Sequence, residues 1–279
     1  SLTATFNQVV NVDTSGGIPS LLLETGSIDR IATYVSGSGS NTLTFSYTVQ
    51  AGDISADLDY QTTAALGLNG ATIRGATSND AVLTLPTVGN AGSLGANKDI
   101  AIDGVAATIS SVTVPANGTY VAGQNLDFTV NLSENVTVDT SGGTPRIAIT
   151  LDTGGTAYAS YLSGSGTSAL VFRLTVVSGQ MDSNGISLGS SIDANGGTLR
   201  DTAGNNSTTT LNAVGNTTGV LVDAVAPQVN AISLDSVSPT NATSVTFTVT
   251  FSEDVSGVDI NDFSLVTSGS VNATLQSLT

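Results

Sequence analysis

One alternating segment recurs along this chain and limits what the chain can fold into. It reads Leu-Asp-Phe-Thr-Val-Asn-Leu-Ser-Glu-Asn-Val at residues 126–136 and Val-Thr-Phe-Thr-Val-Thr-Phe-Ser-Glu-Asp-Val at residues 245–255, and a less regular copy occupies residues 3–10. Apolar and polar side chains alternate in each copy, so the two sets point to opposite faces of an extended chain. The pattern predicts a β-strand with one face on a core and one face in water.

Other segments return at a similar spacing, which indicates a repeated structural unit. Val-Asp-Thr-Ser-Gly-Gly at residues 12–17 returns at residues 138–143, and Tyr-Val-Ser-Gly-Ser-Gly at residues 34–39 returns as Tyr-Leu-Ser-Gly-Ser-Gly at residues 161–166. A repeat of about 120 residues is far longer than a solenoid repeat and close to an immunoglobulin-like domain. We therefore predict an all-β chain of tandem immunoglobulin-like antiparallel β-sandwiches, about 120 residues per repeat.

These spacings divide the chain into three expected domains. Residues 1–103 form a repeat whose first strand is missing, residues 104–223 form a complete repeat, and residues 224–279 form the N-terminal part of a third repeat. Because the chain starts and stops inside repeats, we expect it to be a fragment of a longer protein. The joints are short, so we expect a semi-rigid rod. Among the shorter expected strands are residues 81–85, 208–211 and 263–266.

Composition and charge exclude several classes of function. The formal net charge of −16 disfavours a nucleic-acid or anionic-membrane partner. With no Cys and no His, disulfides, zinc–thiolate sites and Ser-His-Asp or Cys-His catalysis are excluded. Paired carboxylates remain, but the absence of Trp and the 5% aromatic content disfavour the cleft of a glycosidase, so we expect no enzyme. No apolar run approaches the length of a membrane span, and we expect no membrane insertion.

Three short segments resemble a known class of repeat. Residues 251–255 (Phe-Ser-Glu-Asp-Val), 199–205 (Leu-Arg-Asp-Thr-Ala-Gly-Asn) and 222–227 (Val-Asp-Ala-Val-Ala-Pro) are similar to bacterial immunoglobulin-like repeats of large surface adhesins, including biofilm-associated proteins and RTX-type adhesins. The resemblance covers nearly all of residues 110–279 and, in weaker form, residues 1–103. It implies tandem sandwiches that form a secreted, surface-held extender stalk, often with calcium at the joints.

Strand direction predicts that acidic side chains gather at the joints. In an antiparallel sandwich the second strand returns toward the linker that led into the first, so Glu134 should lie near Asp103. If the last hairpin returns to the same end, Asp201 joins them. Carboxylate and amide oxygens together suit a calcium ion, although Asp is also a common turn residue. The candidate metal ligands at the two joints are Asp103, Glu134, Asp201, Asn205, Asp223 and Glu253.

Two further patterns qualify this expectation. Gln8 occupies the position of Glu134 in the first repeat, and Gly75 occupies the position of Asp201, so a cation site at the head of that repeat is in doubt. Asp53, Asp57 and Asp59 lie close together, but their spacing does not match an EF-hand loop, and turn formation is the better interpretation.

The sequence therefore predicts a structural role at the cell surface or outside the cell. We expect an extender segment of a bacterial adhesin or fibre, with calcium as its cofactor and the neighbouring repeats of the same parent chain as its partners. Two alternatives are a surface-layer or extracellular filament subunit, in which copies of the chain associate with one another, and a carbohydrate- or ice-binding module. Incomplete repeats at the two ends could also accept a strand from another copy.

Overall fold

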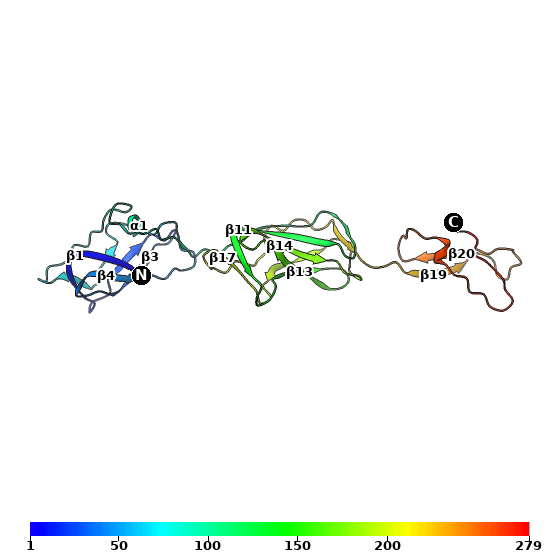
Figure 1. Ribbon diagram of the computed structural model, residues 1–279, viewed down its shortest axis with the longest axis horizontal. Helices are drawn as coiled ribbons and strands as arrows, with labels where there is room; N and C mark the ends of the chain where they lie inside the picture. Colours follow the sequence, from blue (N-terminus) through cyan, green and yellow to red (C-terminus); the bar gives the residue numbers. More distant parts are fainter. Residues whose placement is uncertain (279) are drawn as a thin grey trace.

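The protein is built almost entirely from β-structure. A computed structural model describes residues 1–278, with 43% of the residues in strands and 3% in helices, which confirms the predicted all-β class. Figure 1 shows three bodies that follow one another along a single axis, from the N-terminus to the C-terminal hairpin. No helix within residues 1–278 has the length and apolar character needed to cross a membrane.

The first body, which we call the N-terminal unit, contains a six-stranded sheet in the order β6-β2-β3-β4-β1-β7. A separate pair of short strands, β5 and β8, ends the unit, and a single helical turn, α1, precedes β8. The elements are β1 (Leu2–Asp13), β2 (Ser20–Leu23), β3 (Arg30–Ser36), β4 (Ser40–Ser46), β5 (Ile54–Ser55), β6 (Leu66–Gly67), β7 (Thr72–Gly75), α1 (Leu94–Asn97) and β8 (Ile102–Asp103).

The second body, the central unit, repeats this arrangement and adds strands to it. Its main sheet has the order β16-β12-β13-β14-β11-β17, with β9 also paired to β11, and a second sheet has the order β10-β18-β15. The elements are β9 (Ile109–Thr113), β10 (Gly118–Tyr120), β11 (Asn125–Asp139), β12 (Arg146–Thr150), β13 (Thr156–Ser163), β14 (Thr167–Thr175), β15 (Met181–Asp182), β16 (Ser187–Asp193), β17 (Thr198–Asp201) and β18 (Val220–Asp223).

The two units share their strand register as well as their strand order. In the N-terminal unit β1 pairs with β4, and the ladder is interrupted after Thr5 and resumes at Val10. In the central unit β11 pairs with β14, and the ladder is interrupted after Asn131 and resumes at Val136. The same irregularity 126 residues apart shows that the repeated sequence folds into a repeated backbone.

Each unit has its own hydrophobic core, and the alternating segments supply it. The apolar side chains of β11 from Leu126 to Val136 are between 0% and 7% exposed, whereas Asn125 and Ser133 on the same strand are exposed. The cluster in the N-terminal unit and the cluster in the central unit have no residue in common. The four buried apolar side chains of β11 that alternate with polar residues are Leu126, Phe128, Val130 and Leu132.

The third body is a single hairpin, which we call the C-terminal hairpin, followed by a 3-10 turn. Strand β19 (Val229–Leu234) pairs with β20 (Phe247–Phe251), and the turn η1 covers Ile260–Asp262. No residue of either strand is buried. The hairpin therefore contributes no hydrophobic core comparable to those of the other two units.

Three of the shorter expected strands are not strands in the structure, and in two of them the hydrogen bonds change partner within a few residues. In residues 81–85, Ala81 donates to the carbonyl of Ile73 but Leu85 donates to that of Thr63. In residues 208–211, the chain bonds first to the segment before β9 and then to β16. Residues 263–266 follow η1 and form no ladder.

A glycine in the β13–β14 hairpin lies very close to a backbone carbonyl of the next strand. Gly164 has a φ of 104°, and a Cβ there would lie 2.1 Å from the carbonyl oxygen of Ala169. Gly166 has a φ of 84° but would meet nothing within 4 Å. We expect Gly164→Ala to destabilise the central unit by more than about 1 kcal/mol, and by more than Gly166→Ala, in urea unfolding. Equal losses would show that the close approach to Ala169 is not maintained.

A candidate cation site at the first joint

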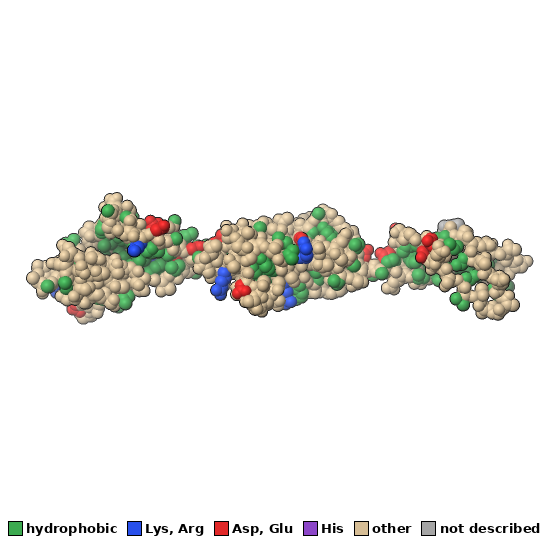
Figure 2. All heavy atoms as spheres, viewed as in Figure 1, with side chains coloured by type: hydrophobic (Ala, Val, Ile, Leu, Met, Phe, Trp, Pro, Cys, Tyr) green, Lys and Arg blue, Asp and Glu red, His purple; other side chains and the backbone are tan. Residues whose placement is uncertain are grey.

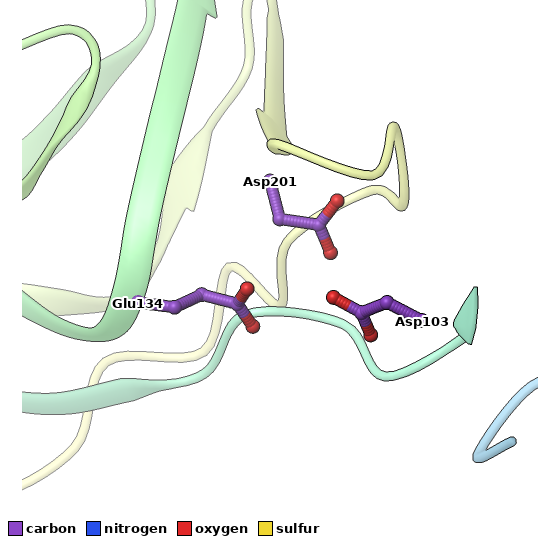
Figure 3. Close-up of side chains that lie close together, drawn as sticks. All are labelled: Asp103, Glu134 and Asp201. Carbon is purple, nitrogen blue, oxygen red and sulfur yellow. The ribbon is translucent and has the colours of Figure 1, made fainter. Parts of the chain in front are cut away.

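Three carboxylates from two units meet at the first joint, which comprises residues 103–108. One oxygen each from Asp103, Glu134 and Asp201 lies within 4.8 Å of the other two. Figure 3 shows the three side chains pointing toward a common centre. Asp103 is the last residue of β8 in the N-terminal unit, whereas Glu134 lies on β11 and Asp201 ends β17 in the central unit. The structure thus brings together three of the six candidate ligands.

Backbone contacts explain why Glu134 lies beside the linker. Ser133 donates its N–H to the carbonyl of Thr108 at 2.8 Å, and the N–H of Thr108 donates to the Ser133 hydroxyl at 3.0 Å. This reciprocal pair attaches the interrupted part of β11 to the chain that enters the central unit. Because Asp201 pairs with Val136 across β11 and β17, its side chain is brought to the same end of the sheet.

Asn205 holds the acidic residues in place through its amide group. The Asp201 carboxylate accepts two hydrogen bonds of 2.9 Å, one from the backbone N–H of Asn205 and one from its Nδ2. The same Nδ2 donates to the backbone carbonyl of Asp103 at 3.1 Å. In this arrangement Asn205 connects the β17 turn to the linker and directs its nitrogen, rather than its oxygen, toward the acidic residues.

The charges at the first joint are not balanced by basic side chains. The four ion pairs within residues 1–278 involve Asp53, Asp80, Asp127 and Asp193, and none of the three clustered carboxylates. Burial, followed by the negative charges of Asp103 and Asp201, raises the pKa of Glu134. The neighbouring negative charges therefore oppose the ionisation of Glu134, and a bound cation would relieve this repulsion.

The donor set fits a hard divalent cation. All three donors are carboxylate oxygens, which calcium and magnesium prefer, and no nitrogen or sulfur ligand belongs to the group. Calcium holds its ligands at about 2.3–2.6 Å, so two ligands on opposite sides of one ion are about 5 Å apart. Oxygens that lie within 4.8 Å of one another can therefore contact a single calcium ion, with other oxygens completing the shell.

The second joint repeats the linker geometry of the first. Gln228 and Ser252 form the same reciprocal pair of bonds: the N–H of Gln228 donates to the Ser252 hydroxyl at 2.9 Å, and the N–H of Ser252 donates to the carbonyl of Gln228 at 2.8 Å. Asp223 accepts a bond from the N–H of Val225, just as Asp103 accepts one from that of Val105. The chain entering the C-terminal hairpin is therefore held like the chain entering the central unit.

The second joint differs in its acidic residues. Asp223 ends β18 and is half-buried, while Glu253 follows β20 and is exposed. Neither belongs to a group of three carboxylates among the residues that the structure describes. The C-terminal hairpin has no counterpart of β17 within those residues, and so no counterpart of Asp201. These two candidate ligands therefore lie at corresponding positions without a third carboxylate beside them.

In the N-terminal unit, uncharged residues occupy the positions of two of the clustered carboxylates. A Cβ added to Gly75 would lie 2.9 Å from Nε2 of Gln8, so these two residues are neighbours in space. They occupy the positions that Asp201 and Glu134 occupy in the central unit. An amide and a glycine therefore lie side by side where the central unit has two carboxylates.

Asp53 and Asp59 have other roles than a calcium loop. The Asp53 side chain is 1% exposed and accepts bonds from Arg30 Nε and from the Gln50 N–H, both at 2.8 Å, and from the Tyr47 hydroxyl. Asp59 accepts bonds from the backbone N–H groups of Tyr60, Gly89 and Leu94. The sequence interpretation of Asp53 as a turn residue missed its ion pair, because Arg30 lies 23 residues away in the chain.

Comparison with protein-family models, with curated proteins and with solved structures finds no match for this chain.

Proposed function

We propose that this chain is a structural extender segment of a secreted, surface-held bacterial adhesin or fibre, built from tandem immunoglobulin-like sandwiches. In this proposal a calcium ion binds at the first joint and restricts bending between the N-terminal and central units. The observation that carries the proposal is the group formed by Asp103, Glu134 and Asp201, because two consecutive units contribute to it.

The shape of the molecule supports a role in spanning distance. The three bodies follow one another without folding back, and acidic side chains are visible at the narrow places between them (Figure 2). Each of the first two bodies has a hydrophobic core of its own. A chain built in this way gains length with each added unit, because no unit depends on a shared core.

The proposed mechanism is a restraint across the joint. Asp103 is fixed to the two-stranded β5–β8 sheet of the N-terminal unit, whereas Glu134 and Asp201 are fixed to the main sheet of the central unit. An ion bound to all three would connect the two sheets directly, in addition to the covalent linker. Without the ion, repulsion among the carboxylates would favour separation of the two units.

The test measures calcium binding and molecular shape on the same samples. We expect titration calorimetry to detect a calcium site in the full chain, and small-angle X-ray scattering to show a narrower distribution of lengths when calcium is added. Glu134→Gln should remove both effects, because it deletes one ligand of the group. Glu253→Gln is the matched control, since Glu253 occupies the corresponding position at the second joint, where no group of three carboxylates forms within residues 1–278. Unchanged calcium binding in Glu134→Gln would contradict the proposal.

A further inference from the structure

The buried carboxylate of Asp53, with its partners Arg30 and Tyr47, belongs to a turn that contacts the linker after Asp103. The Asp53 backbone carbonyl accepts the N–H of Gly104 at 2.7 Å, and the N–H of Gly52 donates to the carbonyl of Gly104 at 2.8 Å. Asp53 is followed by Ile54, which pairs with Asp103 in the β5–β8 ladder. The residue after Asp103 is therefore bonded on both sides to the turn that contains Asp53.

This turn is fixed by the side chain of Asp53 itself. Its carboxylate accepts hydrogen bonds from three groups, on Arg30, Tyr47 and Gln50, and its side chain is almost fully buried. Burial raises the pKa of Asp53, but the bonds from Tyr47, Arg30 and Gln50 outweigh it, so the net effect lowers that pKa. The carboxylate is thus held ionised between fixed partners, on the same residue whose backbone carbonyl binds the Gly104 N–H.

The linker also approaches this turn closely. A Cβ on Gly104 would lie 2.2 Å from the carbonyl oxygen of Gln50, so a larger residue could not adopt the same path without displacing the turn. Glycine is the residue that permits such a close backbone approach. The position of Asp103 relative to the Asp53 turn is therefore tightly restricted.

The second joint has the same backbone bonds without the charged cluster. Ala224 donates to the carbonyl of Gln180 at 2.8 Å and accepts from the N–H of Gly179 at 2.8 Å, as Gly104 does with its own partners. Gln180 replaces Asp53, and its Oε1 accepts a bond from the Val177 N–H. The ionised cluster therefore distinguishes the joint that has three clustered carboxylates from the joint that does not.

We propose that Asp53 is a positioning residue for the cation site, and that it couples cation binding at the first joint to the order of the β5–β8 pair in the N-terminal unit. The inference rests on the proposed calcium site. Asp53 does not contact the ion; it holds the backbone from which the Asp103 carboxylate extends. Outer partners that orient metal ligands typically change metal affinity by about 10- to 100-fold when they are lost.

The test combines calcium titration with hydrogen exchange on the 279-residue chain. In the wild type, calcium should slow amide exchange at Ile54 and Gly104 as well as at Ser133 and Asn205. Asp53→Asn should weaken calcium binding about 10-fold and abolish the protection of Ile54 and Gly104, while the central unit remains protected at saturating calcium.

Two further variants separate positioning from a general loss of stability. Tyr47→Phe removes one of the three bonds to Asp53 and should weaken calcium binding by a smaller factor, with the N-terminal unit still folded. Asp127→Asn breaks the ion pair with Arg173 near the start of β11, before the ladder interruption that precedes Glu134, and should leave the calcium affinity unchanged.

The possible outcomes are distinct. Wild-type affinity and protection in Asp53→Asn would overturn the coupling while leaving the calcium site intact. If Asp53→Asn fails to fold, unchanged calcium affinity in Tyr47→Phe would overturn the coupling instead. A wild-type chain that binds no calcium at all would overturn both the site and the coupling. A loss of affinity in Asp127→Asn equal to that in Asp53→Asn would also count against the positioning role.

Discussion

Phe172→Ala is expected to destabilise the central unit by about 3–5 kcal/mol while leaving the N-terminal unit unaffected. Phe172 is 0% exposed, lies opposite Phe128 in the β11–β14 ladder, and contacts Tyr161 edge-on with ring centroids 5.9 Å apart. Removing its ring leaves a cavity that the surrounding β-strands cannot fill by small shifts. Calorimetry of the full chain should show one transition lowered in temperature and another unchanged.

Phe45→Ala is the matched control for this prediction. Phe45 is also 0% exposed, and it contacts Tyr34 at 6.0 Å in the N-terminal unit, so the two aromatic pairs correspond. Its replacement should lower the temperature of the other transition, with a similar loss in the free energy of unfolding. If either substitution lowers both transitions together, the two hydrophobic clusters do not unfold independently, and the description of two separate cores is wrong.

Calcium removal should have the second large effect, and Glu134→Gln should abolish it. At a calcium concentration 100 times the dissociation constant, one site adds about 2.7 kcal/mol to the free energy of unfolding of the wild type. Glu134→Gln lacks a ligand and should gain little from calcium. In chelator, however, the variant should be more stable than the wild type, because it has one fewer negative charge beside Asp103 and Asp201. A variant less stable than the wild type in chelator would contradict this account of the joint.

The pH dependence of the same pair provides an independent check. The pKa of Glu134 is raised above its usual 4.5, so the folded, calcium-free protein binds the proton more tightly than the unfolded chain does. The resulting stability is fully present below pH 4.5 and is lost as the pH rises through the folded-state pKa. We therefore expect the wild type to fall below Glu134→Gln in stability over that range. Comparing the two proteins removes the contributions of the other carboxylates.

The strands that could be predicted from the sequence are those with strict alternation. In β11 the four alternating apolar side chains are all buried, because a period of two matches the geometry of the strand. The parallel pairing of β10 with β18 was not predictable, since the two strands are about 100 residues apart and neither contains more than four residues. Residues 81–85 are four-fifths apolar without strict alternation, and their hydrogen-bond partners change along the segment.

Part of the candidate site could be predicted from the sequence, because strand direction determines the end of the sheet at which a residue lies. In an antiparallel sandwich β11 returns to the linker and β17 ends on the same side, and Glu134 and Asp201 lie there beside Asp103. The role of Asp53 could not be predicted from strand direction. Its contact with Arg30 depends on how β3 faces the turn before β5, and no repeat contains that pair a second time.

The division of the acidic group between two sheets also affects how the protein should be dissected. Because Asp103 belongs to β8, excising the central unit at its own first strand would remove one of the three carboxylates. A single repeat studied in isolation would then lack a property that exists only where two repeats are adjacent. Shortened versions of this protein should therefore keep neighbouring repeats as pairs, with the intervening residues intact.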